Sequence, residues 1–269
     1  MMIAVSFTAQ AQAQTVSMGH VNMITTDIAA EHDFWLTLGG ISGERAGKKY
    51  VKFPGVIVTF SQGVPAGGTV GTVINHFGLQ FSDLERTVAA LMDAGYQIIT
   101  ETAVAGIANV SVDAGHIATN SAHNVRYAFA LAPNGARIEL YENNDLDAPV
   151  SAHHVHFYSP HVDQMKAWYV ATFGAAGGTR ADMEAADIEG INLTFSYNAN
   201  KQAQTLGRAL SRIGFEVAGL ETMMENLRDG ADVRIDQPYS MDADLGIYSA
   251  TVTDPWGTAI KLTEGLNDF

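Results

Sequence analysis

Three side chains in the first half of the chain could bind a divalent metal: His20, His76 and Glu139. They stand at matching points of an internal repeat, in the segments GHVNMITTD, INHFGLQFSD and RIELYEN. Two neutral imidazoles and one carboxylate hold divalent transition metals and leave coordination positions open for other ligands. The residue types therefore predict one metal site built from these three side chains.

The second half carries an altered copy of this set. Its matching segments, HHVHFYSPH, SRIGFEVAGL and AIKLTEG, place His154, Arg212 and Lys261 at the three points. A histidine beside two cations cannot hold a metal, so the group formed by His153, His154 and His156 is interpreted as part of a degenerate site. One metal ion per chain is the expected result.

Two interpretations of the altered copy are open. In the first, Arg212 and Lys261 replace the metal structurally, and Glu216, on the same strand face as Arg212, balances their charge. In the second, the cations form an anion-binding pocket. We favour the structural interpretation because a pairing carboxylate is available within the same strand.

Three further residues are candidates for catalysis. Tyr141 lies two residues after Glu139, so it should share the face of Glu139 and could donate a hydrogen bond to a substrate. His123 and Tyr127 precede the closing strand, and either could act as an acid or base. Solvated loop histidines and rim tyrosines are the alternative interpretation.

A fourfold repeat must position these side chains. Each unit has an alternating strand, a helix ending near a glycine, and further strands. The opening strands are expected at 20–25, 76–81, 154–158 and 212–217, and the helices at 29–38, 84–94, 162–173 and 220–228. In 76–81, Phe77 and Leu79 share an apolar face, and His76 lies on the other.

The predicted fold class is α+β, with four βαβββ modules paired into two cup-shaped mixed sheets and helices on the outer faces. Pairing of consecutive units predicts an N-terminal domain at 15–147, which carries the metal site, and a C-terminal domain at 150–267 with the degenerate copy. The units could also associate differently, for example by exchange between two chains of a homodimer.

These motifs resemble the vicinal oxygen chelate (VOC) superfamily, which includes glyoxalase I, bleomycin-resistance proteins and extradiol dioxygenases. The resemblance covers nearly the whole chain beyond its N-terminal segment and is most specific in HVHFYSPHVDQMKAWYVATFG, RIGFEVAGLETMMENL and DPWGTAIKLTEGL. It implies metal ligands at His20, His76 and Glu139. Glyoxalase-type members add a fourth ligand, whose place here falls near Ile57, so the set is more similar to that of the dioxygenase branch.

The resemblance implies a metal-dependent dioxygenase, isomerase or lyase, whose small substrate chelates the metal through two oxygens. Fe(II) or Mn(II) suits such a ligand set, whereas Zn(II) or Ni(II) would need another protein ligand or more water. The alternative is a non-catalytic protein that binds or sequesters a small molecule, as in the bleomycin-resistance branch.

The composition limits the classes of binding partner and the cellular compartments that we expect for the protein. A net charge of −14, with 15 lysines and arginines, argues against binding to nucleic acid or anionic membranes, and no cysteine is present to serve as ligand or nucleophile. Residues 1–14 end in AQAQ, which suits signal-peptidase cleavage. They are interpreted as a signal peptide of a periplasmic or secreted protein, or else as a disordered tail of a cytoplasmic one.

Overall fold

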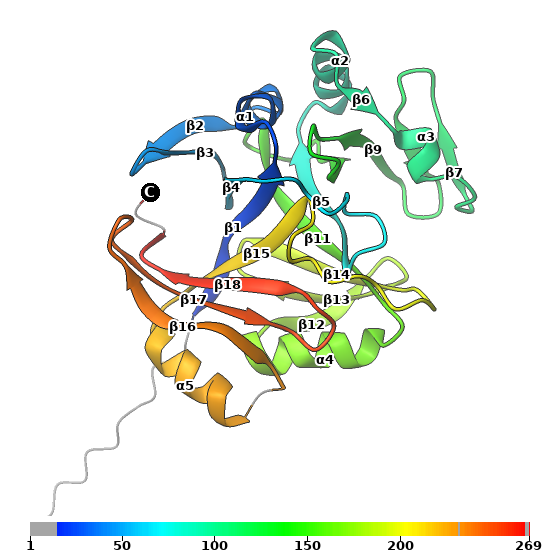
Figure 1. Ribbon diagram of the computed structural model, residues 1–269. Helices are drawn as coiled ribbons and strands as arrows, with labels where there is room; N and C mark the ends of the chain where they lie inside the picture. The colour runs from blue at the N-terminus through cyan, green and yellow to red at the C-terminus, as the bar shows by residue number, and fades with distance from the viewer. Residues whose placement is uncertain (1–14, 231, 267–268) are drawn as a thin grey trace, which may run out of the picture.

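The computed structural model describes residues 15–230, 232–266 and 269 (Figure 1). The predicted signal peptide or tail at 1–14 lies outside these residues. No helix among the described residues is long and apolar enough to cross a membrane.

Four successive units follow the predicted order of strand, helix and strands. The first contains β1 (Val16–Thr25), α1 (Ile28–Thr37), β2 (Ile41–Arg45), β3 (Lys48–Phe53) and β4 (Val56–Gln62). The second contains β5 (Ile74–Phe81), α2 (Leu84–Asp93), β6 (Gln97–Ile98), α3 (Thr100–Ala103), β7 (Val110–Val112), β8 (Ala118–Asn120), β9 (Val125–Leu131) and β10 (Arg137–Glu142).

The third unit contains β11 (Val150–Ser159), α4 (Val162–Phe173), β12 (Ala176–Arg180), β13 (Met183–Ile188) and β14 (Ile191–Tyr197). The fourth contains β15 (Leu210–Val217), α5 (Leu220–Gly230), β16 (Arg234–Asp242), β17 (Ile247–Thr253) and β18 (Ala259–Glu264). The α+β class and the four modules are therefore confirmed, and the second unit is enlarged by β6, α3, β7 and β8.

Local sequence signals explain where the helices begin and end. Asp27 and Asp83 cap α1 and α2, because each side chain accepts a hydrogen bond from a backbone N–H of the first turn. Gly174 ends α4 with φ of 68°, a left-handed conformation that favours glycine. Gly230, expected beyond the end of a helix, is instead the last residue of α5.

The pairing of the units differs from the expected one. One sheet has the order β16-β17-β18-β15-β1-β4-β3-β2 and joins the first unit to the fourth. The other has the order β12-β13-β14-β11-β5-β10-β9-β8-β7 and joins the second unit to the third. Figure 1 shows the blue β1 beside the yellow β15. Each half of the chain therefore contributes to both sheets, and the prediction that consecutive units pair within each half is wrong.

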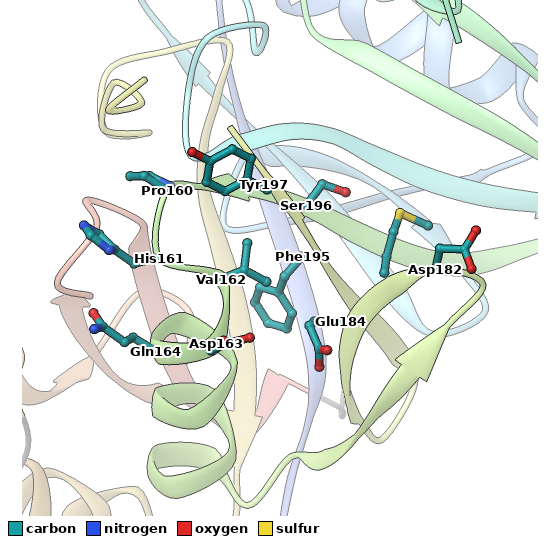
Figure 2. A pocket seen from close by; sticks show the side chains of 11 residues that line it. Pro160, His161, Val162, Asp163, Gln164, Asp182, Glu184, Phe195, Ser196 and Tyr197 are labelled. Atoms are coloured by element: carbon teal, nitrogen blue, oxygen red, sulfur yellow. The ribbon is translucent and has the colours of Figure 1, made fainter. Parts of the chain in front are cut away.

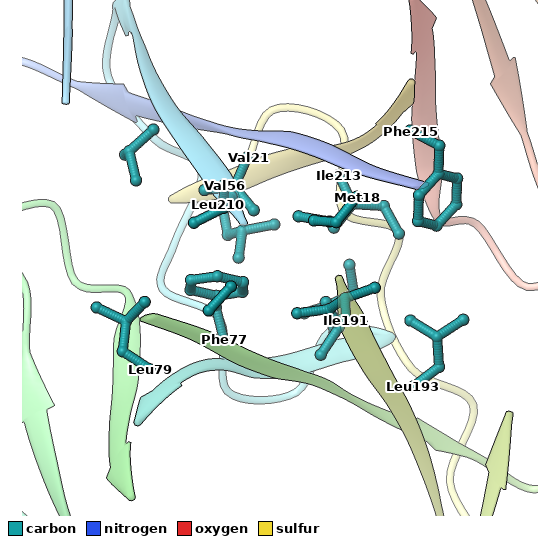
Figure 3. Packing of buried hydrophobic residues seen from close by; sticks show 14 of the residues in the cluster. Met18, Val21, Val56, Phe77, Leu79, Ile191, Leu193, Leu210, Ile213 and Phe215 are labelled. Carbon is teal, nitrogen blue, oxygen red and sulfur yellow. The ribbon is translucent and has the colours of Figure 1, made fainter. Parts of the chain in front are cut away.

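The apolar faces of the two sheets pack against each other. Val21 and Ile213 of one sheet face Phe77 and Leu193 of the other across a shared core (Figure 3). All four side chains are fully buried, and each contributes about 1.5–3 kcal/mol relative to an exposed position. The shared core thus holds the two sheets together.

Helices α1 and α4 tie the two sheets together at this core. Trp35 of α1 contacts the ring of Phe53 in one sheet and that of Phe77 in the other. Phe173 of α4 contacts Phe215. Because side chains alternate along a strand, the polar faces that carry His20 and His76 point away from this shared core, on opposite sides of the molecule.

Candidate metal centre

His76, His154 and Glu139 converge on the polar face of the second and third units. They come from β5, β11 and β10, which are neighbours in one sheet. Oε2 of Glu139 lies 2.9 Å from Nε2 of His76 and 3.6 Å from Nε2 of His154, and the two Nε2 atoms are 3.1 Å apart. Three potential ligand atoms therefore point at one place.

Hydrogen bonds at the far side of each imidazole orient these ligands. Nδ1 of His76 donates to Oδ1 of Asn75 at 2.9 Å, and the same oxygen accepts from Arg137. Nδ1 of His154 lies 2.8 Å from Nδ1 of His153. With a proton on each ligand's Nδ1, both Nε2 lone pairs face the carboxylate, which is the arrangement of metal-binding histidines.

The spacing of the three atoms fits a transition metal. Ligands at about 2.1 Å from a metal are separated by about 3.0 Å at right angles and by about 3.4 Å in a tetrahedron. The observed separations of 2.9, 3.1 and 3.6 Å span these values. A proton on Nε2 accounts for the 2.9 Å contact without a metal, and a divalent cation can replace that proton between two imidazoles and a carboxylate. The donor set therefore fits a divalent metal.

His156 is a further histidine of this cluster. Its ligand atom lies within 4.8 Å of those of His76 and His154. Nε2 of His156 is also 2.8 Å from Oγ of Ser196. The two sets share His76 and His154, and we prefer Glu139 as the third ligand because its oxygen lies within 3.6 Å of both Nε2 atoms and supplies negative charge.

Burial and charge set the protonation of the centre. Burial alone would raise the pKa of Glu139, but His154 and His76 outweigh it and hold this pKa well below its usual value. Burial also lowers the pKa of His76 and His156. The site therefore presents an ionised carboxylate, and burial favours the neutral form of His76 and His156; these are the forms in which such groups bind metals.

The position that would supply a fourth ligand holds Thr194. Glu139 lies opposite Gly78 in the β10–β5 pair, and Thr194 lies opposite His156 in the equivalent β14–β11 pair. A threonine hydroxyl is a poorer metal ligand than a carboxylate. In the other sheet the equivalent residue is Thr59, opposite Asn22, and not Ile57 as the sequence suggested.

The three predicted catalytic residues line the same cavity of about 440 Å³ as His76, His154 and Glu139. The Tyr141 ring stacks on that of His153, with centroids 4.3 Å apart. Burial and Glu139 raise the pKa of Tyr127 to about 12, so its hydroxyl stays protonated. His123 lies at the rim, where its Nε2 is 3.2 Å from the exposed carboxylate of Asp182.

The structure separates His20 from the other two predicted ligands. His20 lies in β1, in the sheet of the first and fourth units, and lines a different pocket together with Arg212 and Lys261. Burial, Lys261 and Arg212 lower its pKa to about 3. The predicted set of His20, His76 and Glu139 thus does not converge, because its members face opposite sides of the shared core.

His154 is the candidate ligand that sequence reasoning missed. The group of His153, His154 and His156 was visible in the sequence, but Arg212 and Lys261 were expected beside it. Both cations lie in the other sheet. One feature of the sequence could have indicated the correct pairing of units. Pairing the second unit with the third brings the histidines beside Glu139 and leaves Arg212 and Lys261 in the other sheet.

The expected ion pair between Arg212 and Glu216 is also absent. Oε1 of Glu216 accepts from the backbone N–H groups of Gly265 and Leu266, and Oε2 accepts from Thr263. This carboxylate holds the end of β18 and does not balance the cations.

A further hollow of about 500 Å³ lies at the start of α4 (Figure 2). Asp163, Asp182 and Glu184 give it an acidic lining, and Glu184 is paired with Lys166. None of the three candidate ligand residues lines it, but it adjoins the cavity of the candidate metal centre, because Met183 and Ser196 line both.

No protein-family model and no curated protein sequence matches the chain. Glyoxalase I from Zea mays is 15% identical and superposes with a TM-score of 0.68, covering 95% of this chain and 94% of that protein. A Bacillus subtilis protein assigned as a dioxygenase is 11% identical, with a TM-score of 0.64 and coverage of 93% and 86%. The chain therefore shares the fold of these two proteins, a fold that its resemblance to the vicinal oxygen chelate superfamily led us to expect.

Proposed function

We propose that the protein is a metal-dependent enzyme of the VOC type, with a divalent metal held by His76, His154 and Glu139. The observation that carries this proposal is the convergence of two Nε2 atoms and one carboxylate oxygen within 3.6 Å of one another. When bound, the metal would polarise two neighbouring oxygens of a small substrate and stabilise the negative charge that develops on them.

The chain's own residues would orient the substrate and exclude water. Tyr127, Tyr141 and Tyr158 line the cavity, and burial raises the pKa of each hydroxyl, so all three remain donors. Phe129 closes one wall against His76. His123, at the rim, is the residue we propose for proton exchange with solvent, because its side chain is partly exposed.

Dioxygenase chemistry is the reaction type that we favour within this class. A set of two histidines and one carboxylate leaves positions for a chelating substrate and for oxygen, and it suits Fe(II) or Mn(II). Thr194 supplies no carboxylate at the place of a fourth ligand. A catechol-like substrate would fit a cavity of about 440 Å³ with aromatic walls.

Metal analysis of protein purified without added metal tests the proposal. We expect a single metal ion per chain in the natural protein, loss of that metal in His76→Ala and in His154→Ala, and full occupancy in His20→Ala, the matched control from the other sheet. If the His154→Ala protein bound as much metal as the natural protein, the assignment of this ligand would be wrong.

Turnover requires a separate measurement. Protein reconstituted anaerobically with Fe(II) or Mn(II) is screened against catechols and 2-oxoaldehydes, with oxygen consumption recorded. Oxygen uptake with a catechol supports the dioxygenase proposal. Turnover of a 2-oxoaldehyde without oxygen uptake would favour isomerase or lyase chemistry. Tight binding without turnover of either class would favour the non-catalytic alternative.

A further inference from the structure

The cup formed by the first and fourth units collects positive charge in an acidic protein. Its pocket of about 540 Å³ is lined by five cationic side chains and one carboxylate: Arg45, Lys48, Lys49, Arg212, Lys261 and Asp242. The whole chain has 29 acidic residues and 15 lysines and arginines. A third of its cations therefore face one pocket.

Two of these cations occupy the places that the ligands hold in the metal centre. Lys261 lies opposite Gly214 in the β18–β15 pair, as Glu139 lies opposite Gly78. Arg212 stands two residues before Gly214, as His76 does before Gly78. The two cups thus present opposite charges at equivalent depths.

Neither Arg212 nor Lys261 forms a hydrogen bond or ion pair with another described residue, and both are partly buried. Glu216, the expected partner, is occupied by backbone N–H groups. Asp242 lines the pocket without reaching either cation, and Asp236 is held by Arg234 and Thr253. Asp242 and Asp236 act on Lys261 and Arg212 only at longer range, so among the described residues neither cation has a direct ion-pair partner.

His20 lines the same pocket as the two cations. The side chain is 5% exposed, and its Nδ1 has no hydrogen-bond partner among the described residues. This atom packs against Gly214, where a Cβ would stand 2.2 Å from it, so any hydrogen bond to a ligand comes from the other ring nitrogen, Nε2. A neutral imidazole donates one N–H, which suits an oxyanion beside two cations.

We propose that this cup binds a small organic anion, with a carboxylate or phosphate group between Arg212 and Lys261 and an apolar body against the remaining wall. Ile57, Phe60 and Leu266 supply that wall. An arginine and a lysine together suit an oxyanion, because the guanidinium offers a planar pair of donors and the ammonium a compact charge. The pocket volume is that of a small-molecule site.

Isothermal titration of the full chain with phenyl phosphate and with benzoate tests the proposal. We expect one of these anions to bind at a single site, and the stronger of the two identifies the head group. Phenol, which has the same ring without the charge, should not bind. Arg212→Gln and Lys261→Gln should each weaken binding about tenfold or more, because each removes a charged hydrogen-bond donor.

His154→Ala is the control from the other cup and should leave anion binding unchanged. If Lys261→Gln is poorly folded, Lys261→Met replaces it, because an apolar side chain of similar length keeps the packing. Failure of both anions to bind at millimolar concentration would overturn the proposal. So would binding that both cation variants retain, or binding that His154→Ala abolishes, since the latter places the anion at the metal centre.

Discussion

Gly78 of β5 lies directly beneath the His154 ring, and its replacement by alanine should weaken metal binding. A Cβ at this position would stand 2.2 Å from Cε1 of His154 and 2.4 Å from its Nδ1, whereas ordinary contact begins at 3.4 Å. The ring must therefore move by about 1.2 Å. Metal–ligand distances tolerate only about 0.2 Å, so Nε2 of His154 leaves the centre.

The loss of one ligand sets the expected magnitude. Structural zinc sites with four ligands bind with about 10–16 kcal/mol, which is about 2.5–4 kcal/mol for each ligand. Since 1.4 kcal/mol is a factor of ten, Gly78→Ala should weaken metal affinity about 100-fold to 1000-fold. The extra methyl group also overpacks the site and should lower the free energy of unfolding by about 1–3 kcal/mol.

Gly214→Ala is a matched control that the fold itself provides. Its Cβ would stand 2.0 Å from Cε1 of His20, which rests on Gly214 as His154 rests on Gly78. Gly214→Ala should therefore show a similar loss of stability with unchanged metal affinity. Competition with a chromophoric chelator gives the affinities, and urea denaturation gives the stabilities. Metal affinity within threefold of the natural protein in Gly78→Ala, or an equal loss in Gly214→Ala, would refute the reasoning.

Three further outcomes are expected. Asn75→Ala removes the acceptor that holds the His76 proton on Nδ1, so metal affinity should fall about 10-fold to 100-fold in the same chelator competition, and Asn75→Asp should retain it. Burial raises the pKa of Glu31 from 4.5 to about 7, so the folded state binds this proton more tightly than the unfolded state does. The associated stability is complete below about pH 4.5 and is lost as the pH rises through 7. The natural protein should therefore lose up to about 3 kcal/mol relative to Glu31→Gln between pH 4.5 and pH 8 in urea denaturation, and parallel pH profiles would contradict this. Lys261→Met removes a partly buried cation that has no ion-pair partner among the described residues, and it should raise the melting temperature by about 2–4 °C in a thermal melt. An unchanged or lower value would count against a net cost of burying this charge.

The repeat was readable from the sequence because its signals are local. Alternation in 212–217 and the glycine that follows 84–94 depend on a few neighbouring side chains, and β15 and α2 lie where these signals placed them, to within two residues. Tyr141 shares the cavity with Glu139 for the same reason, since residues two apart on a strand face the same way.

The partners of each unit were not readable in this way. All four opening strands present the same pattern of apolar and polar residues, so alternation cannot choose between a neighbour along the chain and a more distant unit. The choice depends on how whole apolar faces pack, as Val21 does over Phe77 from the opposite sheet. The sequence therefore placed His154 on the correct, polar face of its strand but paired that strand with the wrong unit.

The pairing of the second unit with the third, inside that of the first with the fourth, also affects the order in which the protein folds. Every strand of the sheet that carries the metal centre lies between Ile74 and Tyr197, whereas the other sheet joins β1 to strands that begin at Leu210. Contacts between nearby segments form sooner than those that close a long loop. During synthesis the strands around the proposed metal centre can pair while β1 still has an unpaired edge. That edge is exposed to other chains until β15 is made, so the emerging N-terminal strand is the segment most in need of protection from aggregation.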